Sequence, residues 1–239
     1  MQSSSMIHEL KQLADSEKRL VLMRFFKTGK GQYGEGDRFL GVTVPQIRSV
    51  VKTHWATCSD ADIEALVTSP WHEIRLAGLL TLVRRYKAAR KDEPACAQIV
   101  KTYLMLAPYV NNWDLVDLSC YELLGDWLYT RDRSLLRELA QPGRTLWEQR
   151  IAIVSTMTFI RRGDFADTLA IADMLLDHAH DLIHKAVGWL LREVGKRDRR
   201  LLESYLVPRY RQMPRTMLRY AIEKFPDARR QAYLKGMVG

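Results

Sequence analysis

Apolar residues recur at helical spacing along nearly the whole chain. In residues 74–83 and 118–124 they stand at positions i, i+3, i+4 and i+7, which is the spacing of one face of a helix. No segment alternates apolar and polar residues as a half-buried β-strand does. The pattern therefore predicts an all-α protein.

Glycine, proline and turn residues divide this pattern into segments. The breaks fall at residues 29–36, 69–70, 93–94, 108, 141–143, 163–164, 208, 214 and 226. About a dozen helices of ordinary length fit between them.

A short motif repeats along the chain. The pattern Glu-x-Arg-apolar-Ala at residues 73–77 returns at 148–152, 75 residues later, which equals two units of 37 or 38. A period near 40 with two helices per unit predicts HEAT-like stacking, in which the second helices line one concave wall. We expect a single domain over residues 1–239. Its wall would bring five residues to one groove: Trp113, Asp117, Arg150, Trp189 and Arg219.

The segment NNWDLVDLS at residues 111–119 carries candidate chemistry. On a helix Trp113 and Asp117 lie one turn apart on the same face. An indole beside a carboxylate can hold a cation, and the acid can stabilise positive charge that develops nearby. The competing explanation for Trp113 is that it packs in the core. The competing explanation for Asp117 is that it pairs with a structural arginine. Asp114 is expected to be exposed in the first helical turn.

The charge indicates what kind of partner the chain binds. It has 37 Lys and Arg against 28 Asp and Glu, a formal net charge of +9. A polyanion is favoured, with nucleic acid as the first candidate and an anionic membrane surface as the second, while an ordinary basic enzyme is the alternative. The N-terminus has no signal-peptide pattern and no apolar run is long enough to span a membrane, so we expect a soluble protein of the cytoplasm.

Cysteine and histidine give no metal-binding pattern. Cys58, Cys96 and Cys120 stand far apart without a CxxC motif and are expected to be reduced thiols. His180 and His184 stand at i, i+4, but no HExxH motif accompanies them, so we expect no metal site.

Several other residues have a structural explanation. Arg75 is expected to tie adjacent helices together, and the basic run at 196–200 is expected to be a solvated connection between helices. Trp71, Trp127 and Trp147 stand on apolar stripes and are expected in the core.

Five ordered motifs carry a family resemblance. They are residues 33–45, 111–117, 146–154, 185–193 and 218–224, and together they extend over nearly the whole chain. In this order they resemble the bacterial alkylpurine DNA glycosylases with HEAT-like repeats, the AlkD family. The resemblance implies a C-shaped α-solenoid with duplex DNA in its basic concave face. It also implies hydrolysis of the N-glycosidic bond of cationic N3- and N7-alkylated purines, such as 3-methyladenine and 7-methylguanine, without extrusion of the base.

Roles for individual residues follow from the motifs that they match. Asp117 would stabilise the oxocarbenium-like sugar or activate water, and Trp113 would face the sugar and the cationic base. Arg150 would clasp a backbone phosphate or pair with Asp117 when DNA is absent. Trp189 would pack on the DNA backbone. Three more cations are candidate DNA contacts: Lys185, Arg192 and Arg219, of which Arg219 could instead be a residue that defines the repeat.

The predicted enzyme is a monofunctional glycosylase of base excision repair. No lysine stands out as a Schiff-base nucleophile, so no lyase step is expected, and neither is a cofactor. The protein would be a monomer on double-stranded DNA with alkylated purines, not bound to a membrane, in the nucleoid of a bacterial cytoplasm. The alternative function is a non-catalytic HEAT-like scaffold for branched DNA or a protein. It predicts salt-sensitive binding without base release.

Overall fold

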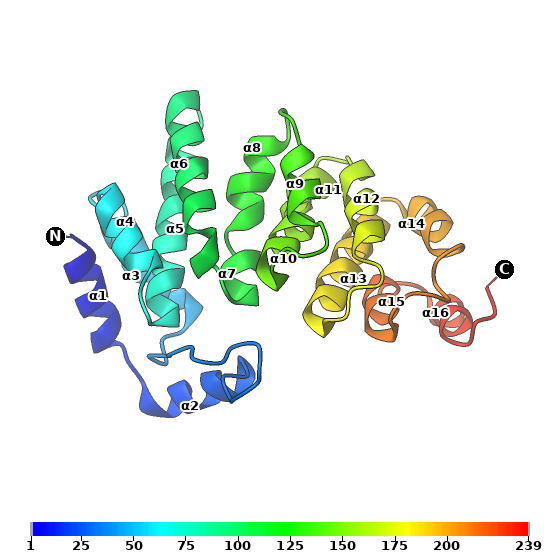
Figure 1. Ribbon diagram of the computed structural model, residues 1–239, viewed down its shortest axis with the longest axis horizontal. Helices are drawn as coiled ribbons and strands as arrows, with labels where there is room; N and C mark the ends of the chain where they lie inside the picture. Colours follow the sequence, from blue (N-terminus) through cyan, green and yellow to red (C-terminus); the bar gives the residue numbers. More distant parts are fainter. Residues whose placement is uncertain (1, 239) are drawn as a thin grey trace. The chain divides into compact units, whose positions relative to one another are not determined.

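The computed structural model describes residues 2–238, and every regular element in that range is a helix (Figure 1). One isolated bridge joins Arg38 to Trp71. The chain divides into two compact units, Met1–Ser119 and Cys120–Gly239. The prediction of an all-α fold is confirmed.

The first unit is built around one buried helix. Its elements are α1 (Gln2–Gln12), α2 (Ser16–Phe25), α3 (Val44–His54), α4 (Asp60–Val67), α5 (His72–Ala88), α6 (Glu93–Leu106), the short 3₁₀ helix Ala107–Tyr109 and α7 (Trp113–Asp117). Helix α5 is buried continuously from His72 to Val83. It packs against α3, α4, α6 and α7, while α1 packs against α3 and α4 (Figure 1). The unit therefore consists of a layer formed by α3, α5 and α7 and a second layer formed by α1, α4 and α6.

The second unit repeats this two-layer arrangement. Its elements are the π-helical turn Tyr121–Gly125, α8 (Asp126–Leu128), α9 (Ser134–Leu139), α10 (Leu146–Ser155), α11 (Met157–Arg161), α12 (Ala166–Met174), α13 (Asp181–Gly195), α14 (Arg199–Leu206), α15 (Arg215–Ala221) and α16 (Asp227–Leu234). Helix α13 packs between α10 and α15, with α12 and α14 on it from the other layer. The stacked helical pairs expected from the repeat are present within each unit.

A glycine allows a close helix crossing in the second unit. A Cβ atom at Gly188 would lie 2.5 Å from the carbonyl oxygen of Met217 and 2.6 Å from the Cβ atom of Tyr220. Both are shorter than any normal van der Waals contact, so only glycine lets α13 and α15 approach this closely.

The helix count and the surroundings of some tryptophans differ from expectation. Sixteen α-helices occur in residues 2–238, instead of about a dozen, because several are interrupted at single residues such as Thr156. Trp71, Trp127 and Trp147 are half-buried instead of core residues, and the guanidinium of Arg131 lies 3.5 Å from the Trp127 ring. The three cysteines are buried and free. No helix in the described range is long and apolar enough to cross a membrane.

Candidate active site

Helix α7 begins at a buried asparagine that fixes its position in the first unit. The side-chain oxygen of Asn112 accepts a hydrogen bond from the backbone N–H of Trp113 at 2.9 Å. Its Nδ2 donates to Asp37 at 3.2 Å, and the side chain is fully buried. A capping side chain that also bonds to a distant loop sets both where the helix starts and where its first turn lies.

Trp113 packs in an aromatic cluster. Its ring stacks on Phe26 at a centroid distance of 5.2 Å and meets the edge of Phe25 at 5.8 Å. Phe26 in turn stacks on Phe39 at 5.0 Å. Trp113 is nevertheless only half-buried. The indole is therefore held rigidly by its neighbours while part of it stays accessible.

Trp113 and Asp117 line the same cavity. It has a volume of about 470 Å³, and its wall is mostly apolar, with Phe25 and Phe26 among its residues and Thr43 at the start of α3. Asp117 is half-buried and follows Trp113 by one helical turn. The sequence-based expectation that these two side chains share a face is consistent with this geometry.

A buried network of four charged groups lies behind this cavity. His72, at the first turn of α5, donates from Nε2 to Asp114 at 2.9 Å and from Nδ1 to Asp37 at 3.1 Å. Arg75 pairs with the other oxygen of Asp37 and donates to the carbonyl of Ser69 at 3.1 Å. All four charged side chains are almost completely buried. Two cations and two anions compensate each other, as buried charges require.

The surroundings of Asp114 and of Arg75 differ from expectation. Asp114 is only 6% exposed, because the first turn of α7 faces the first turn of α5, where His72 lies. The expectation of an exposed Asp114 is wrong. Arg75 bonds to Asp37 and to the carbonyl of Ser69, which both lie in loops, instead of tying adjacent helices together.

Electrostatics keep His72 and Asp37 charged at neutral pH. Burial by itself would lower the pKa of His72, but the carboxylates of Asp114 and Asp37 outweigh it and raise this pKa from 6.5 to about 9. Burial pushes the pKa of Asp37 upward, while the hydrogen bond from His72 and the charge of Arg75 lower it below its ordinary value overall. The imidazole is therefore an imidazolium that donates from both nitrogens.

Glu73 holds the loop that leads to the cavity. Its carboxylate accepts three buried backbone N–H groups, from Leu40 at 2.9 Å, Gly41 at 2.8 Å and Val42 at 3.2 Å. Gly41 has φ +91°, and a Cβ there would lie 2.1 Å from the carbonyl oxygen of Asp15, so this position requires glycine. The loop then enters α3 through Thr43. Helix α5 thus positions both the cavity wall and the start of α7.

In the second unit, Arg150 is part of the contact between two helices. It lies on α10, is 5% exposed and donates from Nη1 to the carbonyl of Leu182 at 2.6 Å, near the start of α13. The neighbouring Gln149 bonds to His178 at 2.8 Å. The Arg150 guanidinium is therefore committed in part to the protein's own backbone.

The histidines near the start of α13 serve its local structure. The Nδ1 atom of His180 accepts from the N–H of Leu182 at 3.1 Å and caps α13, and His184 bonds to the carbonyl of His178. Burial, with the charges of the other two histidines, lowers the pKa of His178. Over residues 2–238 no cluster of three His, Cys, Asp or Glu could hold a metal ion.

The remaining candidates lie on α13 and α15. Trp189 is half-buried, with Lys185 one turn before it and Arg192 one turn after it on the same face. Lys185 pairs with Asp181 at 2.7 Å, and Arg192 pairs with Glu223. Arg219 is exposed and forms no ion pair with any described residue. Of the basic run at 196–200, residues 196–198 connect α13 to α14 and Arg199 and Arg200 belong to α14, while Lys196 and Arg197 pair with Glu193.

Sequence reasoning missed three residues that support the cavity: His72, Asp37 and Glu73. Glu73 and Arg75 belong to the repeated Glu-x-Arg-apolar-Ala motif, which lies in the first two turns of α5 and of α10 and was a usable signal for a helix start. No pattern marks His72 and Asp37 as partners, because they are 35 residues apart and meet only in the folded unit.

Fold and site together define a class of protein: an all-helical repeat protein with an indole and a carboxylate on the wall of an aromatic cavity. The chain matches the family of the DNA alkylation repair enzyme over residues 6–225 and belongs to this family. A solved structure, described as a "Predicted DNA alkylation repair enzyme from Enterococcus faecalis", shares the fold with a TM-score of 0.67 at 15% identity. The match covers 90% of this chain and 97% of that one. No curated protein sequence matches the chain. Family membership indicates an enzyme of DNA repair with DNA as its substrate.

Proposed function

We propose that the protein is a monofunctional DNA glycosylase that releases cationic N3- and N7-alkylated purines from duplex DNA. The observation that carries the proposal is that Trp113 and Asp117 line one cavity, on a helix whose start is fixed by buried polar contacts. Membership of the DNA alkylation repair enzyme family supports it.

The chemistry needs little more than these two groups. An alkylated purine that already carries a positive charge is a good leaving group, so no acid has to protonate it. Asp117 would stabilise the positive charge that develops on the deoxyribose and orient the attacking water. Trp113 would contribute a cation–π interaction of roughly 0.5 to 2 kcal/mol. The products are the free base and an abasic site.

Residues of the second unit would hold the DNA. We assign backbone contacts to Trp189, Lys185, Arg192 and Arg219, and the clasp on a phosphate near the lesion to Arg150. To bind phosphates, Lys185 would break its ion pair with Asp181 and Arg192 its ion pair with Glu223. Arg219 has no ion pair to break. Action as a monomer on bacterial chromosomal DNA is part of the same proposal.

A base-release assay tests this function. We expect the purified protein to free 7-methylguanine from alkylated duplex DNA without added metal. Asp117→Asn should slow release by at least about 100-fold, since it removes the charge that stabilises the transition state, and should leave DNA binding nearly unchanged. The matched control is Asp177→Asn, an exposed acid of the second unit, which should release base at the wild-type rate.

The alternative scaffold predicts a different result. If the protein binds DNA but frees no alkylated base under conditions in which a control glycosylase does, it is a non-catalytic DNA-binding protein. Equal release by wild type and Asp117→Asn would remove Asp117 from the proposed role while leaving the activity standing.

A further inference from the structure

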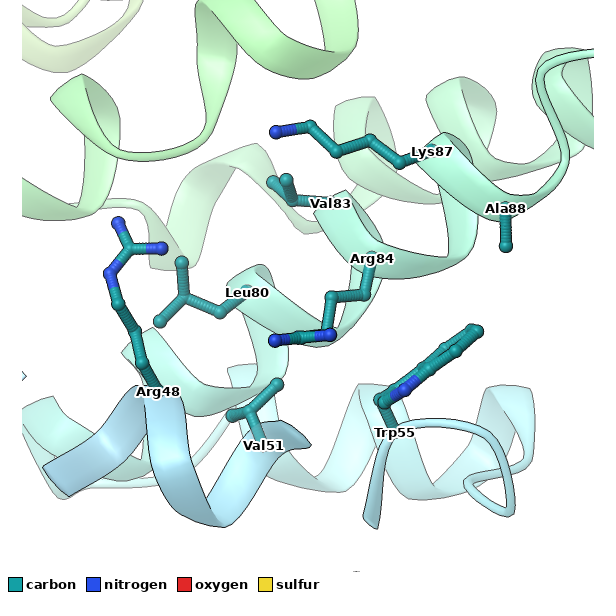
Figure 2. A pocket seen from close by; sticks show the side chains of 8 residues that line it. All are labelled: Arg48, Val51, Trp55, Leu80, Val83, Arg84, Lys87 and Ala88. Carbon is teal, nitrogen blue, oxygen red and sulfur yellow. The ribbon is translucent and has the colours of Figure 1, made fainter. Parts of the chain in front are cut away.

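A second hollow of the first unit combines positive charge with an apolar floor. It has a volume of about 310 Å³ and lies between α3 and α5. In Figure 2 the charged ends of Arg48, Arg84 and Lys87 surround Leu80 and Val83, with the Trp55 indole along one side. Leu80 and Val83 are buried, whereas Trp55 is half-buried.

Two of these cations lack acidic partners. Within the part of the chain that the structure describes, no carboxylate pairs with Arg48 or Arg84. The next residue, Arg85, points elsewhere and pairs with Asp60 at 2.5 Å. Many other arginines of the protein also form ion pairs with carboxylates, as Arg133 does with Asp164 and Asp167. Two guanidinium groups at one hollow, neither of them paired with a carboxylate, favour binding of an anion there.

The form of the hollow indicates which anion. Two guanidinium groups on facing helices suit the oxygens of one phosphate group, since each presents a planar fork of donors. A bare phosphate would leave Leu80, Val83 and Trp55 without a partner. A phosphate that carries a deoxyribose would place its sugar against this apolar surface, as DNA-backbone contacts do.

The hollow lies at a defined distance from the candidate active site. His72 and Arg84 are twelve residues apart on α5, which corresponds to about 18 Å along the helix. For a duplex whose axis runs parallel to α5, at 3.4 Å per phosphate along one strand, this length equals on the order of five nucleotides. We propose that Arg48, Arg84 and Trp55 bind a phosphate–deoxyribose unit of duplex DNA several nucleotides away from the lesion. This proposal rests on the proposed glycosylase function.

Binding measurements on the intact protein test the proposal. Undamaged duplexes are used, so that the result does not depend on base release: one long duplex and two that are shortened on one flank each. The Arg48→Ala/Arg84→Ala double variant should bind the long duplex more weakly. The slope of log affinity against log salt should decrease in magnitude by about 1, because the two arginines share one phosphate contact. With one of the shortened duplexes, which lacks the contacted nucleotides, wild type and variant should bind equally.

Lys101→Ala is the matched control, because Lys101 is an exposed cation of α6 outside the hollow. It should leave the salt slope of the long duplex closer to wild type than either single arginine variant does. Circular dichroism melting of all variants verifies that they fold. Wild-type affinity and slope in the double variant would overturn the proposal, and so would an equal loss of affinity on all three duplexes.

A further arm separates DNA from free phosphate as the source of the anion. Inorganic phosphate, added at constant ionic strength, should not change the fluorescence difference between wild type and Trp55→Phe, whereas the long duplex should. A response to inorganic phosphate alone would make the hollow a small-anion site and overturn the assignment to DNA. Base release by Lys101→Ala should proceed at the wild-type rate, and it is measured separately from the binding of undamaged duplexes. This keeps failure of the hollow distinct from failure of the glycosylase function.

Discussion

At the scale of single residues, the candidate site depends on how Trp113 and Asp117 are held. Both side chains belong to a helix of only five residues, which is too short to be stable by itself. Asn112 bonds to Asp37 and Asp114 bonds to His72, so the first turn of α7 is anchored on both sides. The indole and the carboxylate are thereby oriented before any substrate arrives, which is what electrostatic stabilisation of a transition state requires.

The titration of His72 gives a first prediction at this scale. Its imidazole resonances should shift near pH 9 in an NMR titration, instead of near the ordinary pKa of 6.5, because two buried carboxylates favour the charged ring. A raised pKa in the folded state stabilises the fold fully below about pH 6.5 and no longer above about pH 9, a contribution of roughly 3 kcal/mol. Unfolding free energy should therefore fall as the pH rises through this window.

The His72→Gln variant identifies the resonances and serves as the control, since it cannot carry the charge. Its stability should lack this component of the alkaline decrease. A His72 resonance that titrates near pH 6.5 in the folded protein would contradict the assignment of an imidazolium.

Individual site residues differed in how far the sequence could predict them. Trp113 and Asp117 were found because their spacing of four is a local property of one helix. The burial of Asp114 could not be predicted in this way, because it depends on His72, which is 42 residues away in the sequence and becomes a neighbour only in the folded unit. Trp127 and Trp147 stand on apolar stripes, yet they end half-buried, because an amphipathic side chain can place one edge at the surface.

At the scale of elements, helix α5 organises the first unit. It contacts five other helices, and its first turn supplies His72, Glu73 and Arg75 to three separate segments. The helical periodicity and the turn residues were sufficient to predict the helices themselves. They could not show that the loop at residues 40–42 bonds to α5, since side-chain bonds to distant backbone groups leave no periodic signal.

Removing the Glu73 carboxylate tests how strongly α5 holds this loop. Glu73→Ala leaves three backbone N–H groups without their acceptor, so it should lower the unfolding free energy by about 2–4 kcal/mol. Chemical denaturation measures the change. The control is Glu64→Ala on the exposed side of α4, with an expected effect within about 0.5 kcal/mol. An effect of Glu73→Ala as small as that of the control would show that water replaces the carboxylate.

At the scale of the whole molecule, the excess of basic residues decides the kind of partner. A net charge of +9 favours any polyanion at long range, and family membership makes DNA the relevant one. Composition predicted this much. Composition could not predict which cations are available to bind DNA, because that depends on packing. Lys185 and Arg192 form ion pairs with carboxylates, while Arg48, Arg84 and Arg219 do not.

Salt titration of DNA binding measures this property of the complete chain. The logarithm of the affinity for duplex DNA should fall linearly with the logarithm of the salt concentration, by about 0.9 per phosphate neutralised. Anionic lipid vesicles at the same ionic strength are the comparison, and the protein should bind them more weakly than DNA. Salt-independent DNA binding would contradict an electrostatic interface, and equal affinity for vesicles would favour a membrane surface as the partner.

The buried network of four charged groups, Asp37, His72, Arg75 and Asp114, has a net charge of zero, and it also restricts how this protein can evolve. Its four charges come from three separate stretches of sequence, and each is needed to balance the others in a place without water. A single replacement would strand a buried charge, so these positions are expected to change together or not at all among related proteins. Covariation between positions 37, 72 and 114 should therefore still be detectable among related proteins whose surrounding helices have lost most of their sequence similarity.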